Sequence, residues 1–194
     1  MHASVGELFH DWHDFYLLVG TASATLVGLM FVAASIGASI FNQDRQPAMS
    51  AFIGSTVVHF SAVLLICILA AIPSHTWGTF GAVIAAAGLV GLGYSGRIWV
   101  QIFIRRSFAV DIVDRLFYGL VPVIGYLMVA VAGFLLLLRW GGAGANVLAV
   151  ALITLLFAGI HNAWDMMSWM VMRTSATPPN PPSSPNPPSN QAPS

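Results

Sequence analysis

Five long stretches of the chain are almost entirely apolar, and short polar segments separate them. A helix of about 20 apolar residues, rising about 1.5 Å per residue, crosses roughly 30 Å of hydrocarbon. The pattern therefore predicts five membrane-spanning helices, at about 15–41, 51–72, 77–104, 117–138 and 146–172. The predicted fold class is an all-α integral membrane protein, a bundle of five transmembrane helices.

The two ends of the chain differ from the spans. In residues 1–14, apolar and polar positions alternate at helical spacing, and Ser4 followed by Glu7 matches a capping box. We expect a short amphipathic N-terminal segment that lies in the membrane interface. Residues 173–194 are rich in Pro, Ser and Asn and lack apolar periodicity. We expect this C-terminal tail to be disordered.

Small residues recur in the first and third predicted spans. Gly20, Ala24 and Gly28 follow one another every four residues in the first span. The third span contains a series of glycines: Gly78, Gly81, Gly88, Gly91, Gly93 and Gly96. Small residues let helices in a membrane approach closely. We therefore expect both spans to pack through these faces, with the third in the centre of the bundle.

Two residues bear on the geometry of the last two spans. Pro122 lies early in the fourth span and is expected to kink it, because proline removes a helical hydrogen bond. A glycine-rich turn follows Arg139, and Asn146 is expected to cap the fifth span.

The composition excludes several classes of protein. The chain is 57% hydrophobic and 7% charged, whereas a soluble domain has roughly 25% charged residues. Seven Arg and no Lys are balanced by seven acidic residues, which leaves no basic surface for nucleic acid. The single cysteine, Cys67, excludes a disulfide framework and a cysteine metal site.

The arginines predict how the chain crosses the membrane. Five spans place the termini on opposite sides, and with the N-terminus outside only Arg139 lies on the outer side. The inner loops and tail then carry Arg45, Arg97, Arg105, Arg106, Arg115 and Arg173. Positive charge accumulates on the cytoplasmic side of membrane proteins. We therefore expect a multi-pass protein of the cell inner membrane with a cytoplasmic C-terminus.

Polar and ionisable side chains near the inner end of the spans are the main candidate site. At about 1.5 Å per residue, Arg97 and Asp165 both fall about 28–30 Å into their spans, and His161 precedes Asp165 by one helical turn. His59 falls within a few ångströms of the same depth. The predicted intramembrane cluster is His59, Tyr94, Arg97, His161, Asn162 and Asp165.

This cluster admits several interpretations. It can be an interhelical polar clasp, with Arg97 and Asp165 paired or reaching water at the interface. It can be a proton or ion relay, because His titrates near neutral pH and carboxylates carry protons in transporters. Haem ligation by His59 and His161 is a third reading, which matched depth permits and no spacing motif supports.

A serine–histidine pair gives a further alternative. Gly93-Tyr94-Ser95-Gly96 is a GxSG string, and His161 lies two spans later; the pair resembles the dyad of rhomboid intramembrane proteases. The further motif residues of that family have no match in the chain. Ser95 also falls at the wrong end of its helix. We therefore expect no enzymatic activity.

The N-terminal segment contains metal-ligating residue types. His10 and His13, three residues apart, lie beside Asp14. Such a set can bind a divalent transition metal, although the two histidines share a helix face only loosely. The simpler interpretation is a wetted interfacial surface, so we expect no bound metal and no cofactor.

Residues 13–38, HDFYLLVGTASATLVGLMFVAASIGA, resemble the first helix of a family of uncharacterised small bacterial multi-pass inner-membrane proteins. In these proteins an aromatic and acidic stretch precedes a small-residue helix that ends in a GLxFVAxS-like string, here Gly28 to Ser35. The resemblance implies a bacterial inner-membrane location. It implies no known activity and no catalytic residue.

Together these observations predict a non-enzymatic scaffold or accessory component that contacts the lipid bilayer and another membrane protein or a second copy of itself. The alternative is a small oligomeric transporter, or an ion- or proton-conducting protein, that uses the inner cluster. The two readings differ in whether His59, His161 and Asp165 hold helices together or move a charge.

Overall fold

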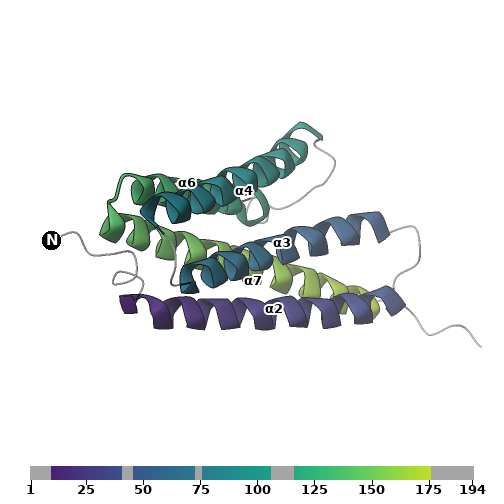
Figure 1. The fold of residues 1–194 in the computed structure, drawn as a ribbon. Helices are drawn as coiled ribbons and strands as arrows, with labels where there is room; N and C mark the ends of the chain where they lie inside the picture. The colour runs from purple at the N-terminus through teal and green to yellow at the C-terminus, as the bar shows by residue number, and fades with distance from the viewer. Residues whose placement is uncertain (1–9, 41–45, 73–75, 106–115, 176–194) are drawn as a thin grey trace, which may run out of the picture.

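The computed structural model describes residues 10–40, 46–72, 76–105 and 116–175, and these ranges are almost wholly helical (Figure 1). The elements are α2 (His13–Ile40), α3 (Gln46–Ala71), α4 (Trp77–Arg105), the π-helical turn η2 (Leu116–Leu120), α6 (Val121–Leu137) and α7 (Gly141–Ser175). Five helices in this part of the chain are long and apolar enough to cross a membrane. The predicted all-helical fold class is therefore confirmed. Residues 1–9 of the predicted amphipathic segment and 176–194 of the predicted tail lie outside the described residues.

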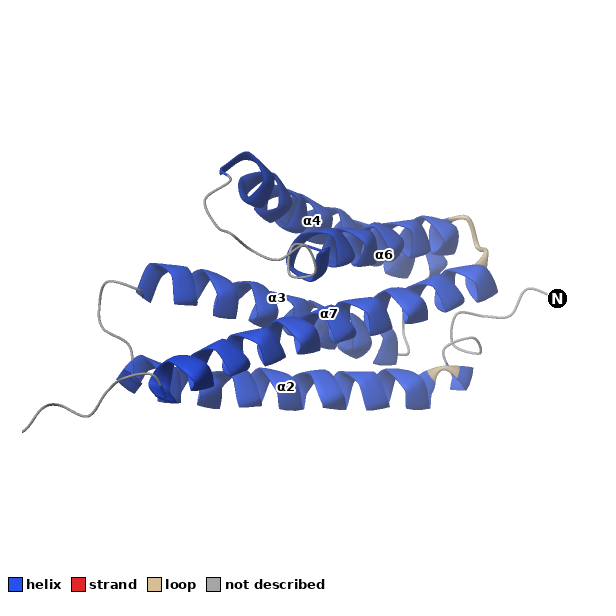
Figure 2. Ribbon diagram, turned by 180° about the vertical axis from the view of Figure 1, so that it is seen from behind, coloured by secondary structure: helices blue, strands red, loops and turns tan. Residues whose placement is uncertain are grey.

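The helices form three layers, which Figures 1 and 2 show from opposite sides. Helices α4 and α6 make one layer, α3 and α7 the middle layer, and α2 the third. The apolar stretch of α7 that is long enough to cross a membrane is 50% buried, the highest share of the five, and that of α2 is 28% buried, the lowest. We call the end where α2, α4 and α7 begin the outer end, and the end where α3 and η2 begin the inner end, after the predicted orientation.

The glycines of α4 make a close contact with α6. A Cβ added to Gly88 would lie 2.3 Å from the backbone nitrogen of Ala130, and one added to Gly133 would lie 2.2 Å from that of Ala85. The two backbones therefore touch, as small residues allow in a membrane. The prediction that this span is central is wrong. Helix α4 lies in one of the two flanking layers and packs mainly against α6. Its glycines allow one very close neighbour, which does not require a central position.

The connection between α6 and α7 is tighter than predicted. Arg139 adopts a left-handed conformation, with φ 62°, and the backbone N–H groups of Arg139 and Trp140 donate to the carbonyls of Leu136 and Leu135. These bonds satisfy the end of α6. Helix α7 then begins at Gly141, so Asn146 lies within the helix and does not cap it.

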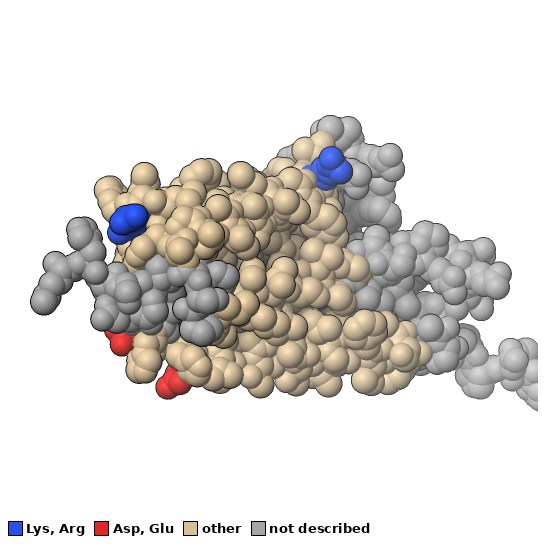
Figure 3. Space-filling view, viewed as in Figure 1, with Lys and Arg blue, Asp and Glu red and all other residues tan. Residues whose placement is uncertain are grey.

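The outer half of the bundle is filled with apolar side chains. Phe80 and Ile84 come from the start of α4, Leu136 from the end of α6, and Leu148 and Leu152 from the start of α7; each is 0–1% exposed. Close packing of this kind excludes water. On the face of the molecule shown in Figure 3, the charged side chains of the described residues lie toward the two ends, and the band between them is uncharged.

Candidate functional site

The centre of the bundle holds a hydrogen-bonded pair of polar side chains. His59 of α3 is 1% exposed, and its Nδ1 lies 3.0 Å from the hydroxyl oxygen of Tyr126 of α6. Its Nε2 lies 3.5 Å from the Oγ of Ser55, one helical turn away. Both ring nitrogens therefore have hydroxyl partners. A buried histidine in this arrangement links α3 to α6.

A second polar group lies nearer the inner end, on α7. The Nδ1 of His161 and the Oδ2 of Asp165 are 3.0 Å apart, and each side chain is 30% exposed. The two atoms are close enough for an ion pair when the imidazole is protonated, but they lack the alignment of a hydrogen bond. The ring of Phe117 stacks on that of His161, with centroids 3.9 Å apart and planes 9° from parallel. This stacking ties η2 to α7.

Asn162 follows His161 directly on α7 and is buried. Its side chain is 1% exposed, and neither its Nδ2 nor its Oδ1 has a hydrogen-bond partner among the described residues. Its backbone carbonyl accepts a hydrogen bond of 3.1 Å from the hydroxyl of Tyr118 in η2. This hydrogen bond fixes the backbone of Asn162, whereas the amide of its side chain has no hydrogen-bond partner among the described residues.

Ser95 is a further buried polar side chain whose Oγ has no partner in the described part of the chain. One turn before it, a Cβ on Gly91 would meet the ring of Tyr126 at 2.1 Å, and one turn after it, Trp99 lies against Gly119. Ser95 therefore lies on the face of α4 that is turned toward η2 and α6. No hydrogen bond among the described residues joins Ser95 to His161.

The predicted cluster thus separates into two groups and two outlying residues. His59 belongs to the central pair, and His161, Asn162 and Asp165 form the inner group. Tyr94 is 36% exposed and Arg97 is exposed. No ion pair joins Arg97 to Asp165 in the described ranges. Helices α4 and α7 make little contact, because η2 and α6 contact both of them.

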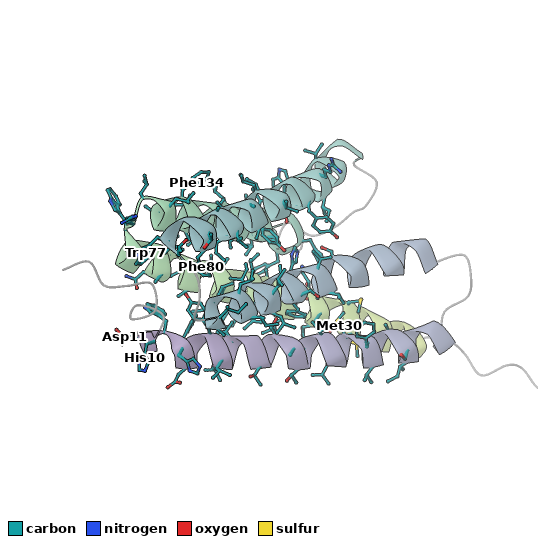
Figure 4. The ribbon with its side chains drawn as sticks, viewed as in Figure 1. His10, Asp11, Met30, Trp77, Phe80 and Phe134 are labelled. Atoms are coloured by element: carbon teal, nitrogen blue, oxygen red, sulfur yellow. The ribbon has the colours of Figure 1, made fainter. Side chains whose placement is uncertain are left out.

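The outer histidines lie on the surface. His13 is 3.3 Å from Asp14 through Nδ1 and Oδ1, with the side chains 55% and 103% exposed. Figure 4 shows His10 and Asp11 just before α2, at the opposite end of the bundle from the inner group. No group of three or more His, Cys, Asp or Glu side chains with metal-binding geometry occurs among the described residues. The surroundings of His13 match a wetted helix surface.

Sequence reasoning missed Tyr126, which completes the central pair. A usable indication existed: His59 lies about 12 Å from the predicted inner end of span two, and Tyr126 lies about 13–14 Å from that of span four. Matched depth of a histidine and a tyrosine in adjacent spans favours a hydrogen bond, because a buried polar group needs a partner. Phe117 and Tyr118 lacked such an indication, since the π-helical turn that carries them has no clear sequence pattern.

The fold and these sites define the class of protein as an all-helical chain with five helices long and apolar enough to cross a membrane. Comparison of the chain with protein-family models, with curated proteins and with solved structures found no match.

Proposed function

We propose that the chain is a five-span protein of a bacterial inner membrane, with its N-terminus outside, and that it acts as a non-enzymatic scaffold or accessory component. The arginine distribution and the resemblance of the first helix support the location and orientation. The exposed apolar side chains of all five helices support insertion into lipid.

One observation carries the functional proposal: several polar side chains inside the described part of the bundle form hydrogen bonds between neighbouring helices. Ser23 of α2 donates to the carbonyl of Phe60 in α3 at 2.6 Å, His59 bonds Tyr126, and Tyr118 bonds the backbone of Asn162. These hydrogen bonds join α2 to α3, α3 to α6, and η2 to α7. Beyond them the outer half is apolar and closely packed, which opposes conduction of an ion in this conformation.

Helix α2 offers the best surface for a partner helix. Three of the six glycines of α4 that the sequence favoured as an interface, Gly81, Gly88 and Gly91, are covered by α6. On α2, by contrast, Gly28 has no atom near the position of an added Cβ, and Leu29 and Phe31 beside it are more than half exposed. A small residue among large ones suits the close approach of an apolar helix. We assign this surface to a transmembrane helix of another membrane protein.

A pair of variants tests the assignment. Gly28→Leu should abolish a chemically crosslinked, stoichiometric complex in native membranes, because the added side chain blocks close helix approach. Gly93→Leu is the matched control, since Gly93 in α4 also has no neighbour within 4 Å; this variant should retain the complex. Loss of the complex in both variants or in neither would contradict the assignment to α2, and no crosslinked complex in the wild type would contradict the scaffold role.

The alternative is a transporter or proton-conducting protein, and the 3.0 Å approach of His161 and Asp165 is the observation in its favour. Asp165→Asn removes the carboxylate charge at almost unchanged size. In reconstituted vesicles we expect the wild type to show no pH-driven proton flux above protein-free vesicles, and the variant only a modest loss of thermal stability. A wild-type flux that this substitution abolishes would favour transport and overturn the scaffold proposal.

A further inference from the structure

The inner part of α4 exposes one cation on a surface that is otherwise apolar. Arg97 is exposed, and it has no ion pair or hydrogen bond among the described residues. Val90, two turns before it on the same face, is 74% exposed, and Val100, three residues after it, is 49% exposed. Hydrocarbon does not solvate a guanidinium, so Arg97 needs water or a group of opposite charge.

The depth of Arg97 matches the boundary between hydrocarbon and headgroups. Helix α4 begins at Trp77, and at about 1.5 Å per residue Arg97 lies about 30 Å further along the helix. That distance equals the thickness of the hydrocarbon core of a bilayer. Because α4 lies in a flanking layer with α6 as its main neighbour (Figure 1), its exposed face is turned to lipid once the chain is inserted. The guanidinium is therefore within reach of phospholipid phosphates.

The backbone of α4 beside Arg97 is bare. Gly96 directly precedes Arg97, and Gly93 lies one turn before it; a Cβ added at either glycine would have no atom within 4 Å. Gly88 and Gly91 of the same helix differ, because a Cβ added there would meet α6. The two open glycines therefore leave room for a headgroup to approach the guanidinium along the helix surface.

The charges around Arg97 favour an anionic headgroup. Asp11 and Asp14 lie at the outer end, and Asp165 on α7 is the one described acid of the inner half. No ion pair joins Asp165 to Arg97 in the described ranges. A zwitterionic headgroup would bring its ammonium beside a guanidinium that no described carboxylate balances. A headgroup of net negative charge avoids that repulsion.

We infer that Arg97, with the open backbone at Gly93 and Gly96, binds the phosphate of one anionic phospholipid of the inner leaflet. Its acyl chains lie along the exposed surface at Val90. A guanidinium suits this ligand, because it can donate two parallel hydrogen bonds to one phosphate. The inference rests on the proposed insertion and orientation in the membrane, and it does not depend on partner binding at α2.

Lipid binding to the full chain in detergent tests the site. Native mass spectrometry with phosphatidylglycerol and phosphatidylcholine measures the affinity for each lipid. We expect phosphatidylglycerol to bind at least about fivefold more tightly, which is the contribution of one arginine near a membrane surface. Arg97→Gln should weaken phosphatidylglycerol binding about fivefold and leave phosphatidylcholine binding unchanged. Arg139→Gln, the matched control, removes an exposed arginine at the outer end and should bind as the wild type does.

Three outcomes of this experiment would overturn the site: no preference for phosphatidylglycerol in the wild type, unchanged binding in Arg97→Gln, or an equal loss in both arginine variants. Gly93→Leu is a second variant, which keeps the charge and fills the open space, so it should also weaken phosphatidylglycerol binding. Unchanged binding in this variant would refute the placement of the headgroup. Circular dichroism shows whether each variant is folded, and recovery of the wild type in the membrane fraction tests insertion separately.

Two further measurements distinguish other occupants of Arg97. An excess of sodium phosphate, compared with sodium chloride at the same ionic strength, should leave phosphatidylglycerol bound. Selective release by phosphate would assign Arg97 to a free anion and overturn the lipid site. Loss of the crosslinked protein complex in Arg97→Gln, with lipid binding unchanged, would assign Arg97 to a protein partner and likewise overturn it.

Discussion

His59 shows how a polar side chain is held within an apolar bundle. Its imidazole is buried, and the hydroxyls of Tyr126 and Ser55 lie at its two ring nitrogens. The bond to Tyr126 crosses from α3 to α6. Removing one partner of such a bond costs more than the bond contributes, because the other partner is then buried and unmet.

Tyr126→Phe should therefore lower the free energy of unfolding by about 1–2 kcal/mol. Thermal unfolding in detergent, followed by circular dichroism, measures the change. Tyr94→Phe is the control, since Tyr94 is partly exposed and its hydroxyl has no hydrogen bond among the described residues; it should change stability by less than about 0.5 kcal/mol. Equal stability of the two variants would show that the hydroxyl of Tyr126 does not support the fold.

Arg139 is strained by its left-handed backbone, with φ 62°. This conformation costs an L-residue roughly 1–2 kcal/mol and costs glycine little. We expect Arg139→Gly to raise the unfolding temperature in the same assay. Arg139→Ala separates the loss of charge from the relief of backbone strain, and it should give no comparable rise. A rise of equal size in both variants would assign the effect to the guanidinium.

Residue types predicted part of the site. His59, His161, Asn162 and Asp165 stand out because ionisable or amide groups are rare within spans. The sequence did not predict which of these residues lie together, because the depth of a residue along a span does not show which side of the helix it faces. Arg97 has the depth of Asp165, yet it lies on a helix that has η2 and α6 between itself and α7.

Among the elements, the α4–α6 pair depends most on single residues. Its backbones are in contact at Gly88 and Ala130, where an added Cβ would lie 2.3 Å from a backbone nitrogen. The neighbouring glycine Gly93 faces open space. Sequence shows that both are glycines in one span but not which of them faces a neighbour.

Gly88→Ala should destabilise the bundle by at least about 1–3 kcal/mol, because the added methyl group forces the helices apart. Gly93→Ala should be neutral or stabilising by about 0.5–1 kcal/mol, because alanine favours the helix. Unfolding temperatures of the two variants provide the comparison. If the first variant were as stable as the second, the close contact between α4 and α6 would be wrong.

Apolar run length predicted the helices well, because a span needs a fixed number of apolar residues and satisfies its own backbone hydrogen bonds. Irregular backbone was harder to predict. Three features depend on contacts between helices that are distant in sequence: the π-helical turn η2, the start of α7 at Gly141, and the place of α4 at one side of the bundle. Those contacts leave no periodicity in a sequence that is apolar almost throughout.

For the whole molecule, the proposals rest on an asymmetric bundle. Among the described residues, the core of the outer half is mainly apolar, and the inner half carries His161, Asn162 and Asp165 of α7. A partner on α2 would add to the periphery and leave both halves unchanged. The asymmetry has a biological meaning only if the inner end faces the cytosol.

Membrane orientation is accordingly the central claim, and labelling of single cysteines tests it most directly. In a Cys67→Ala background, Ser4→Cys and Ser184→Cys place one thiol near each end of the chain. With a membrane-impermeant maleimide, we expect Ser4→Cys to react in cells whose inner membrane is accessible from outside, and Ser184→Cys to react only in inverted vesicles. Reaction of both positions from the same side would contradict the five-span arrangement.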